Sequence, residues 1–331
     1  TNESKVTIVL PCKAENCSEV KYHQLEANTP QLYLYLPLLG TENWGWNYII
    51  HAPSFTCDKD LRDSLLFVGN GQNNDDQAQK NRDLIGLAGQ LIREFLSSCL
   101  DKMTERKYIG RVNFLPAPQD RLKEYYEDLQ REWVSYFEAQ PLVKSNDTYI
   151  AVKDVKVLDK QLYSACMDDA ALLDALYELF EKDAHKLVIP EKQDMIHWSR
   201  YLDEWYVGKP NSHTITLSDI CGLIKKTALT AEDLTWLHKI CEFLKDNPNP
   251  LIPLQSIVPN ENIELVESEL VKPISFNSTF KSILKVLLPT EVAKFVHPDF
   301  VDILVDSVEY DKESAKKALT AYVTELPTYY S

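Results

Sequence analysis

Glycine is scarce in this sequence, and the glycine-rich loops that hold phosphate groups are missing. Only nine of the 331 residues are glycine, and neither G-x-G-x-x-G nor G-x-x-x-x-G-K occurs. The single Gly-x-Gly, from Gly69 to Gly71, is typical of a turn. Because such loops bind phosphate through closely approaching backbone N–H groups, their absence excludes both of these phosphate-binding sites from the chain.

Paired cysteines, blocks of basic residues and long apolar runs are also lacking. The seven cysteines are odd in number and scattered singly, which argues against a disulfide framework and favours a reducing, cytoplasmic environment. No apolar run approaches the roughly 18 residues that cross a bilayer, and the first residues lack the pattern of an export signal. The formal net charge is −15. We therefore expect neither a nucleic acid nor a membrane as a partner.

The segment 31–100 contains the clearest structural pattern. Apolar residues alternate over 32–36 and again over 46–51, and turn residues lie between them, so the pattern predicts a β-hairpin with one buried face. A short apolar strand at 65–68 and a helix over 74–100, with Asn74 as its N-cap, are predicted to follow. The aromatic residues of the hairpin are expected in the core rather than on an exposed platform. They are Tyr33, Tyr35, Trp44 and Trp46.

The rest of the chain is predicted to be mainly helical. Helical periodicity recurs along it, and a capping box at Thr230 and Asp233 precedes one of the helices. The predicted helices cover 121–137, 161–180, 192–206, 230–244, 277–288 and 311–326. Hairpins are expected near 141–157 and near 252–265, either as weak copies of one motif or as two unrelated hairpins.

These patterns predict an α+β protein, and 331 residues with 44% hydrophobic content suggest two or three domains. The first, over 1–112, is a sheet-plus-helix domain that begins with a strand at 5–10. Prolines in NFLPAPQ mark its end. A mainly helical domain over 113–248 carries the hairpin near 141–157. The third domain, over 249–331, combines a hairpin with C-terminal helices.

The order of features in residues 6–100 resembles a known family. A strand, Leu-Pro-Leu, a Gly-Thr-Glu turn, an aromatic strand, Ser-Phe, Arg-Asp, a second short strand, an Asn-rich loop and a long helix follow one another. This order is similar to the segment downstream of the ATPase domain in sacsin-type proteins. It is more distantly similar to the middle domain of the ninety-kilodalton heat-shock chaperones, which belong to the GHKL ATPase superfamily. The resemblance implies that 1–112 is a transducer-like domain.

The resemblance also implies where ATP binds. GHKL enzymes hold ATP and magnesium in an amino-terminal domain with a D-x-G-x-G turn, and no Asp stands two residues before a Gly in this chain. The chain itself is therefore expected to bind no cofactor and to hydrolyse no ATP. ATP and Mg²⁺ are implied for a parent protein whose N-terminal ATP-binding domain is the first partner. A homodimer and an unknown protein client are the further partners that the resemblance implies.

One side chain is implied to take part in the parent's chemistry. The family's downstream domain supplies a basic residue from a loop ahead of a long helix, and this residue reaches the γ-phosphate. The matching residue here is Arg62, with Lys59 as the second candidate. A guanidinium stays charged and forks onto phosphate oxygens, so it stabilises charge in the transition state. The alternative is that Arg62 pairs with Asp58 or Asp63 on the surface, which contributes little.

Other functions remain open from the sequence. The chain is either the middle and C-terminal region of a sacsin-like, chaperone-like GHKL ATPase or a non-catalytic helical interaction module, whereas an independent hydrolase has no motif in its favour. His238 and Cys241 lie three residues apart on a predicted helix, with Cys221 nearby. Structural zinc needs four ligands, so we expect a packed cysteine beside a surface histidine and no metal site. Cys12 and Cys17 have no predicted role.

Overall fold

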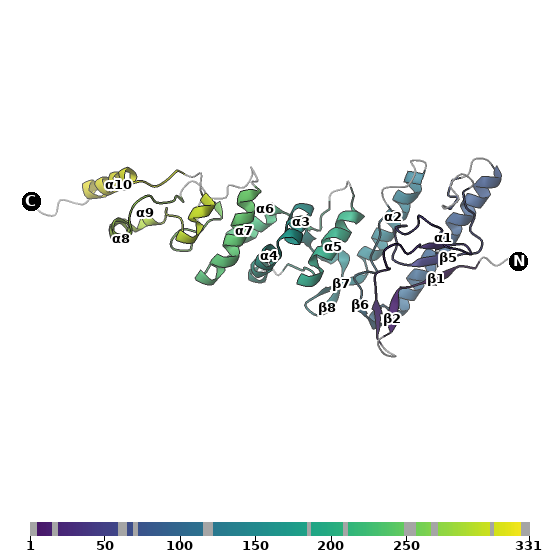
Figure 1. Cartoon of the computed structure of the whole chain (residues 1–331). Coiled ribbons are helices and arrows are strands. Elements are labelled where there is room, and N and C mark those ends of the chain that lie inside the picture. Colours follow the sequence, from purple (N-terminus) through teal and green to yellow (C-terminus); the bar gives the residue numbers. More distant parts are fainter. Residues whose placement is uncertain are drawn as a thin grey trace, which may run out of the picture. The chain divides into compact units, whose positions relative to one another are not determined.

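The protein is an α+β protein with small sheets and many helices, shown in Figure 1 as a computed structural model. The structure describes residues 5–14, 19–58, 65–68, 72–114, 122–183, 187–207, 211–247, 256–265, 271–304 and 308–325. The chain divides into two compact units: unit 1 is Thr1–Lys160 with Val188–Thr214, and unit 2 is Gln161–Leu187 with Ile215–Ser331. These boundaries differ from the predicted ends at 112 and 248, and the three-domain division stays a prediction.

The first sheet of unit 1 differs from the predicted hairpin. Its strand order is β1 (Thr7–Val9), β5 (Ile49–His51), β4 (Leu32–Tyr33). β1 is antiparallel to β5, but β4 is parallel to it, so the predicted hairpin over 32–51 is wrong.

The reason is a second reversal of the chain between β4 and β5. Directly after β4 the chain folds back, so that Tyr33 bridges Pro37 and the Leu38 N–H donates to the Leu32 carbonyl at 2.9 Å. The Thr41 hydroxyl then accepts from the N–H groups of Gln31 and Leu32. With two reversals between them, β4 and β5 run in the same direction.

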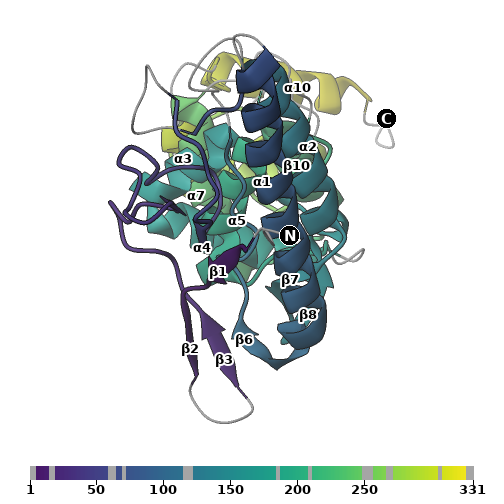
Figure 2. The same cartoon turned by 90° about the vertical axis from the view of Figure 1, so that its right-hand side faces the viewer.

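A second small sheet and two long helices complete the amino-terminal part of unit 1. The sheet has the order β2 (Cys12–Ala14), β3 (Val20–Tyr22), β6 (Met103–Glu105). The helices are α1 (Gln72–Cys99) and α2 (Lys123–Glu138). Figure 2 shows α1 and α2 running side by side along the small sheets. The predicted helix is confirmed, but Asn74 lies within its first turn, so the predicted N-cap is wrong.

An aromatic core fills unit 1 between these elements. Ring centroids of neighbouring aromatic side chains lie 5.0–6.4 Å apart. The cluster consists of Trp44, Trp46, Phe67, Phe114, Tyr126 and Trp133. The predicted core position is confirmed for Trp46, which is buried, and wrong for Tyr35, which is 77% exposed because it lies in the tight reversal after β4. Each fully buried aromatic side chain contributes roughly 1.5–3 kcal/mol of stability.

The remainder of unit 1 contains the predicted hairpin and the helix that packs beside it. β7 (Pro141–Ser145) and β8 (Thr148–Ala151) pair antiparallel around Asn146 and Asp147, both with positive φ, which is the type I′ geometry that favours these residues. α5 (Lys192–Trp205) buries Met195, Trp198, Leu202 and Trp205 on one face and packs on β9 (Val157–Leu158). The hairpin near 141–157 is confirmed.

Unit 2 begins with two pairs of helices. Its first helices are α3 (Lys160–Asp168), α4 (Ala170–Lys182), α6 (Leu217–Lys226) and α7 (Leu234–Asp246). A single helix over 161–180 was the prediction, but Asp169 adopts an extended conformation and accepts from the Ala171 N–H at 3.0 Å, so it caps a second helix. The predicted capping box of Thr230 and Asp233 is confirmed.

The C-terminal part of unit 2 surrounds a small core of its own. Its helices are α8 (Ser278–Leu287), α9 (Pro289–Val292) and α10 (Lys312–Glu325). Leu284, Phe295 and Ala315 are fully buried in this core. Pro259 and Leu265 form an antiparallel bridge at the position of the predicted second hairpin. Residues 251–255, which include most of its first predicted strand, lie outside the described residues.

The remaining short elements lie between these helices and strands. They are β10 (Thr214–Ile215) and the 3₁₀ helices Leu100–Lys102, Val152–Asp154, Ala231–Asp233 and Pro298–Leu304.

Candidate functional site

The segment predicted to reach the γ-phosphate, with Arg62 and Lys59, lies outside the described residues. The chain on either side of it is described. Cys57 and Leu65 form an antiparallel bridge, and the Leu66 N–H donates to the Thr56 carbonyl at 3.0 Å. The chain on the two sides of residues 59–64 therefore comes together at what we call the loop base (residues 56–57 and 65–66).

Asn81 of α1 holds the loop base. Its side chain is fully buried. The Asn81 Oδ1 accepts from the Thr56 N–H at 2.9 Å, while Nδ2 donates to the carbonyls of Thr56 at 2.7 Å and Leu66 at 2.8 Å. A side-chain amide has two donor hydrogens and one acceptor oxygen, and all three groups are used here. Thr56 and Leu66, on either side of residues 59–64, are thus bound to the same side chain of α1.

The loop base continues into the aromatic core. Phe67 stacks on Tyr125 of α2 with centroids 5.1 Å apart, and on Trp44 at 6.2 Å. The Phe67 carbonyl accepts from the Arg82 guanidinium of α1. Burial raises the pKa of Tyr125, so its hydroxyl stays neutral. A displacement of the loop base therefore acts directly on α1 and α2, because packed interiors transmit strain.

Sequence reasoning missed Asn81, although the sequence contains a signal for it. Ala78, Asn81, Ile85 and Ala88 follow one another at intervals of three and four residues, so Asn81 lies on the apolar face of α1. A polar residue on a buried helix face has to find hydrogen-bond partners. Here the partners are backbone groups of a distant loop.

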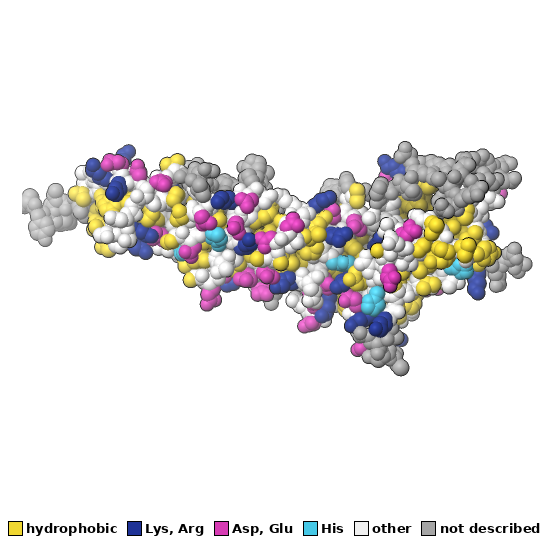
Figure 3. Space-filling view, viewed as in Figure 1, with side chains coloured by type: hydrophobic (Ala, Val, Ile, Leu, Met, Phe, Trp, Pro, Cys, Tyr) yellow, Lys and Arg dark blue, Asp and Glu magenta, His cyan; other side chains and the backbone are white. Residues whose placement is uncertain are grey.

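An exposed apolar patch covers part of the first sheet of unit 1. Val9 is 50% exposed on β1, and Tyr35, Leu36 and Leu39 are 60–77% exposed in the reversal after β4. We call these four residues the outer-face patch. Figure 3 shows hydrophobic side chains gathered over this part of the unit. Val9 pairs with Ile49 and lies at the edge of the sheet opposite to β4. Contiguous exposed apolar surface marks interaction sites.

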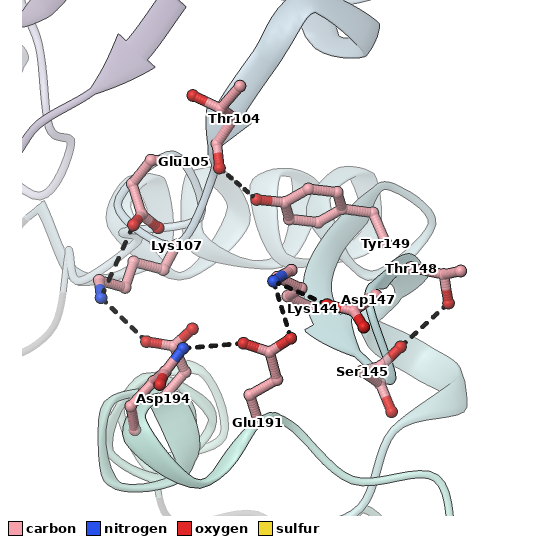
Figure 4. Close-up of polar contacts among 11 residues, drawn as sticks. Thr104, Glu105, Lys107, Lys144, Ser145, Asp147, Thr148, Tyr149, Glu191 and Asp194 are labelled. Atoms are coloured by element: carbon pink, nitrogen blue, oxygen red, sulfur yellow. Dashed lines mark hydrogen bonds and ion pairs between the residues drawn. The ribbon is translucent and has the colours of Figure 1, made fainter.

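A polar cavity of about 200 Å³ lies elsewhere in unit 1, between β6, the β7–β8 hairpin and the start of α5. Figure 4 shows two lysines there, each joined to two carboxylates: Lys107 to Glu105 and Asp194, and Lys144 to Asp147 and Glu191. The Lys107 Nζ lies 2.9 Å from the Asp194 Oδ1, and the Lys144 Nζ lies 2.9 Å from a Glu191 carboxylate oxygen. The Tyr149 hydroxyl donates to the Thr104 carbonyl at 2.8 Å.

The charged side chains of this cavity are paired with one another. Burial alone would lower the pKa of Lys107, but the hydrogen bond and charge of Asp194 outweigh it, and the pKa is raised. Burial lowers the pKa of His197 to about 4, so at neutral pH its ring is uncharged and its Nε2 pairs with the Lys107 carbonyl at 3.0 Å. Both lysines stay charged and paired. The network links the hairpin to α5 and offers no free base or nucleophile among these residues.

The candidate metal residues are not brought together in the part of the chain that the structure describes. No group of three or more His, Cys, Asp or Glu side chains there is arranged to hold a metal ion. Cys241 is fully buried as predicted, and the His238 Nε2 lies 3.2 Å from the Asp302 carboxylate. Burial raises the pKa of Cys221 and of Cys12 to about 11, which keeps both thiols protonated. Cys17 lies outside the described residues.

Two further findings bear on function. Of the helices among the described residues, none combines the length and the apolar character that crossing a membrane requires. No protein-family model matches the chain, and no similar protein is found among curated proteins or solved structures.

Proposed function

We propose that this chain is the middle and C-terminal region of a sacsin-like GHKL ATPase. In this role it couples ATP binding in a separate N-terminal domain to a conformational change or to the binding of a client protein. The observation that carries the proposal is the attachment of the loop base to α1 by Asn81. This attachment supplies a path from the segment that contains Arg62 to the core of unit 1.

The mechanism follows from the chemistry of that segment. An arginine that contacts the γ-phosphate binds the ATP state more tightly than the ADP state, and such a difference is what shifts a two-state arrangement of domains. The loop base, bound to Asn81, is the route by which this contact would act on α1. The outer-face patch supplies apolar surface for docking the ATP-binding domain.

The test uses a polypeptide that carries both this chain and its ATP-binding domain. Arg62→Ala is expected to leave nucleotide affinity unchanged and to lower the rate of ATP turnover by about 10²–10³-fold, the usual effect of removing a group that stabilises transition-state charge. Arg131→Ala is the matched control, because Arg131 is exposed on α2 and its ion-pair partner among the described residues is the nearby Asp128. Turnover that is equal in both variants would remove Arg62 from the mechanism.

A second function is favoured by the polar cavity and the outer-face patch together. The cavity's lysines are both paired, and the patch is apolar, which also fits a non-catalytic helical interaction module. Small-angle scattering with and without a non-hydrolysable ATP analogue separates the two functions. If the chain is a region of an ATPase, the analogue should make the parent protein more compact. If the chain is a non-catalytic interaction module, the scattering curve should not change.

A further inference from the structure

The C-terminal helices of unit 2 border an apolar groove that the described residues of the unit leave open. The groove has a volume of about 730 Å³ and is lined by one end of α8 and one face of α10. Phe280, Leu319 and Val323 provide its apolar surface, and Val323 is 63% exposed. We call this the α8–α10 groove; both helices are labelled in Figure 1.

The walls of the groove are held in place by the core beneath it. Leu284 of α8 and Ala315 of α10 are fully buried in the same cluster, and Phe280 and Leu319 pack against that cluster with their other sides. Asn277 caps α8 by accepting from the Phe280 N–H at 3.1 Å. The groove is therefore a fixed feature of the unit and needs no rearrangement to receive a ligand.

The residues of α10 that line the groove change from basic to apolar along the helix. Lys312, Lys316, Leu319 and Val323 all line the groove and follow one another at intervals of three and four residues, so they form one stripe. The first half of the stripe is basic and the second half apolar. The amino-terminal end of a helix also carries partial positive charge, which adds to that of the lysines.

The charge of these helices is opposite to that of the chain. α8 and α10 contain five lysines and two glutamates, whereas the whole chain has a net charge of −15. Lys281 and Lys285 share the single carboxylate of Glu261. Lys316 has only an exposed contact of 3.9 Å with Glu313, and among the described residues Lys312 has no ion-pair partner. Among the described residues, the groove thus combines an apolar floor with two lysines and one glutamate, Glu313, so its lining carries a net positive charge.

We propose that the α8–α10 groove binds a short amphipathic helix of a partner protein, with an apolar stripe flanked by carboxylates. The apolar stripe lies against Phe280, Leu319 and Val323. The carboxylates at one end meet Lys312 and Lys316. A helix suits this site because its side chains at intervals of three and four residues match the spacing of the groove stripe. The charge complementarity sets the orientation of the bound helix.

A negatively charged membrane shares part of this chemistry but fits the geometry less well. Membrane-binding helices present a convex apolar face, whereas here the apolar side chains line a hollow between two helices. Apolar residues that protrude from α8, such as Val286, which is 81% exposed, do not line the groove. These residues therefore provide a control surface.

The experiment measures binding of a defined peptide to the full chain by fluorescence anisotropy. The probe is a fluorescein-labelled, alanine-based helical peptide of about 18 residues, with leucine at every third or fourth position and flanking glutamates. A second peptide carries lysine in place of each glutamate. We expect saturable binding of the glutamate peptide that weakens as salt is raised, and binding of the lysine peptide at least about tenfold weaker.

Two pairs of variants locate the binding. Val323→Glu, in the groove floor, is expected to weaken the glutamate peptide at least about tenfold, whereas Val286→Glu makes the same change on exposed α8 surface and leaves binding within about twofold. Lys316→Glu is expected to weaken binding about threefold or more, whereas Lys317→Glu, one residue away and outside the groove, has little effect. All four positions are exposed or line the open groove, and thermal melting by circular dichroism checks that the variants fold.

Three results would overturn the proposal. The first is absence of saturable binding by the unmodified chain. The second is equal binding of the two peptides, or equal losses in the groove variants and their controls. The third is sedimentation with phosphatidylserine vesicles that is lost in Val323→Glu while the peptide does not bind, which would assign the surface to a membrane.

Discussion

Asn81 and Thr56 are joined by two hydrogen bonds in opposite directions, although 25 positions separate them in the sequence. The Asn81 Oδ1 accepts from the Thr56 N–H at 2.9 Å, and the Asn81 Nδ2 donates to the Thr56 carbonyl at 2.7 Å. The Asn81 amide pairs with the backbone N–H and carbonyl of Thr56, as a residue of a neighbouring β-strand would. The third bond, to the Leu66 carbonyl, joins the other end of the loop base to the same side chain.

Replacing Asn81 by leucine is expected to destabilise the protein by about 2–4 kcal/mol. Leucine keeps the volume but leaves the Thr56 N–H and the Leu66 carbonyl without their partner, while the Thr56 carbonyl keeps the Leu66 N–H. Buried unsatisfied groups each cost roughly 1–3 kcal/mol before water relieves them. Chemical denaturation measures the loss. Gln90→Ala, an exposed change on the same helix, should stay within about 0.5 kcal/mol. An equal effect of the two changes would mean that Asn81 does not hold the loop base.

The Asn81→Leu variant also tests whether the loop base opens separately from the rest of unit 1. Native-state hydrogen exchange should show faster exchange of the Thr56 and Leu66 amides in Asn81→Leu, while amides in the middle of α2 keep their protection. If α2 loses protection to the same extent, the change unfolds the unit as a whole and the loop base has no separate stability.

Gly89 and Gly86 of α1 are expected to respond to alanine in opposite directions. A Cβ at Gly89 would lie 2.9 Å from the Trp133 ring of α2, whereas nothing lies within 4 Å of a Cβ at Gly86. Gly86→Ala should stabilise by about 0.5–1 kcal/mol through helix propensity. Gly89→Ala should destabilise by roughly 1–3 kcal/mol because the ring is packed and must shift. Thermal unfolding of the two variants measures both effects. Stabilisation by both changes would show that the contact between α1 and the Trp133 ring of α2 has room for a methyl group.

Asp233 is expected to make unit 2 sensitive to acid. Burial alone would raise its pKa, but hydrogen bonds from Lys182, Trp236 and Thr230 outweigh burial and lower the pKa to about 2. A carboxylate with a depressed pKa stabilises the fold fully above its unfolded value near 4, and the stabilisation is lost as the pH falls through about 2. The contribution at neutral pH is about 2 kcal/mol.

Asp233→Asn should therefore lower the free energy of unfolding at pH 7, and its difference from the unmodified chain should shrink between pH 4 and pH 2. Urea denaturation over this range gives the comparison. Glu232→Gln changes the neighbouring exposed carboxylate and serves as the control. If the difference in unfolding free energy between Asp233→Asn and the unmodified chain stays constant as the pH falls, the charge of Asp233 does not contribute to stability.

The helices and the β7–β8 hairpin could be predicted from the sequence because their signals are local. Periodicity predicts the buried faces of α1 and α5, and Asn146 and Asp147 favour the positive φ that a two-residue turn requires. The parallel pairing of β4 and β5 could not be predicted in this way. It depends on a second reversal that Thr41 fixes by hydrogen bonds to residues about ten positions away.

The candidate sites depend still more on distant residues. The polar cavity joins Lys107 to Asp194, which are 87 positions apart, and no local pattern indicates that they meet. The α8–α10 groove needs the relative placement of two helices that the sequence predicts only singly. Arg62, by contrast, was inferred from a resemblance, and its role stays a prediction.

The ion pair of Lys107 and Asp194 is expected to be stronger than a typical surface pair. The two side chains are 23% and 9% exposed, and their charged atoms lie 2.9 Å apart. The comparison pair in unit 1, Lys160 and Asp203, is 75% and 42% exposed with a separation of 3.7 Å. Double-mutant cycles with Lys→Met and Asp→Asn should give a coupling energy of about 1–3 kcal/mol for the first pair and less than about 1 kcal/mol for the second. Equal couplings would mean that solvent screens the cavity as fully as the surface, and that this pair holds the segment after β6 to α5 no more strongly than a surface pair would.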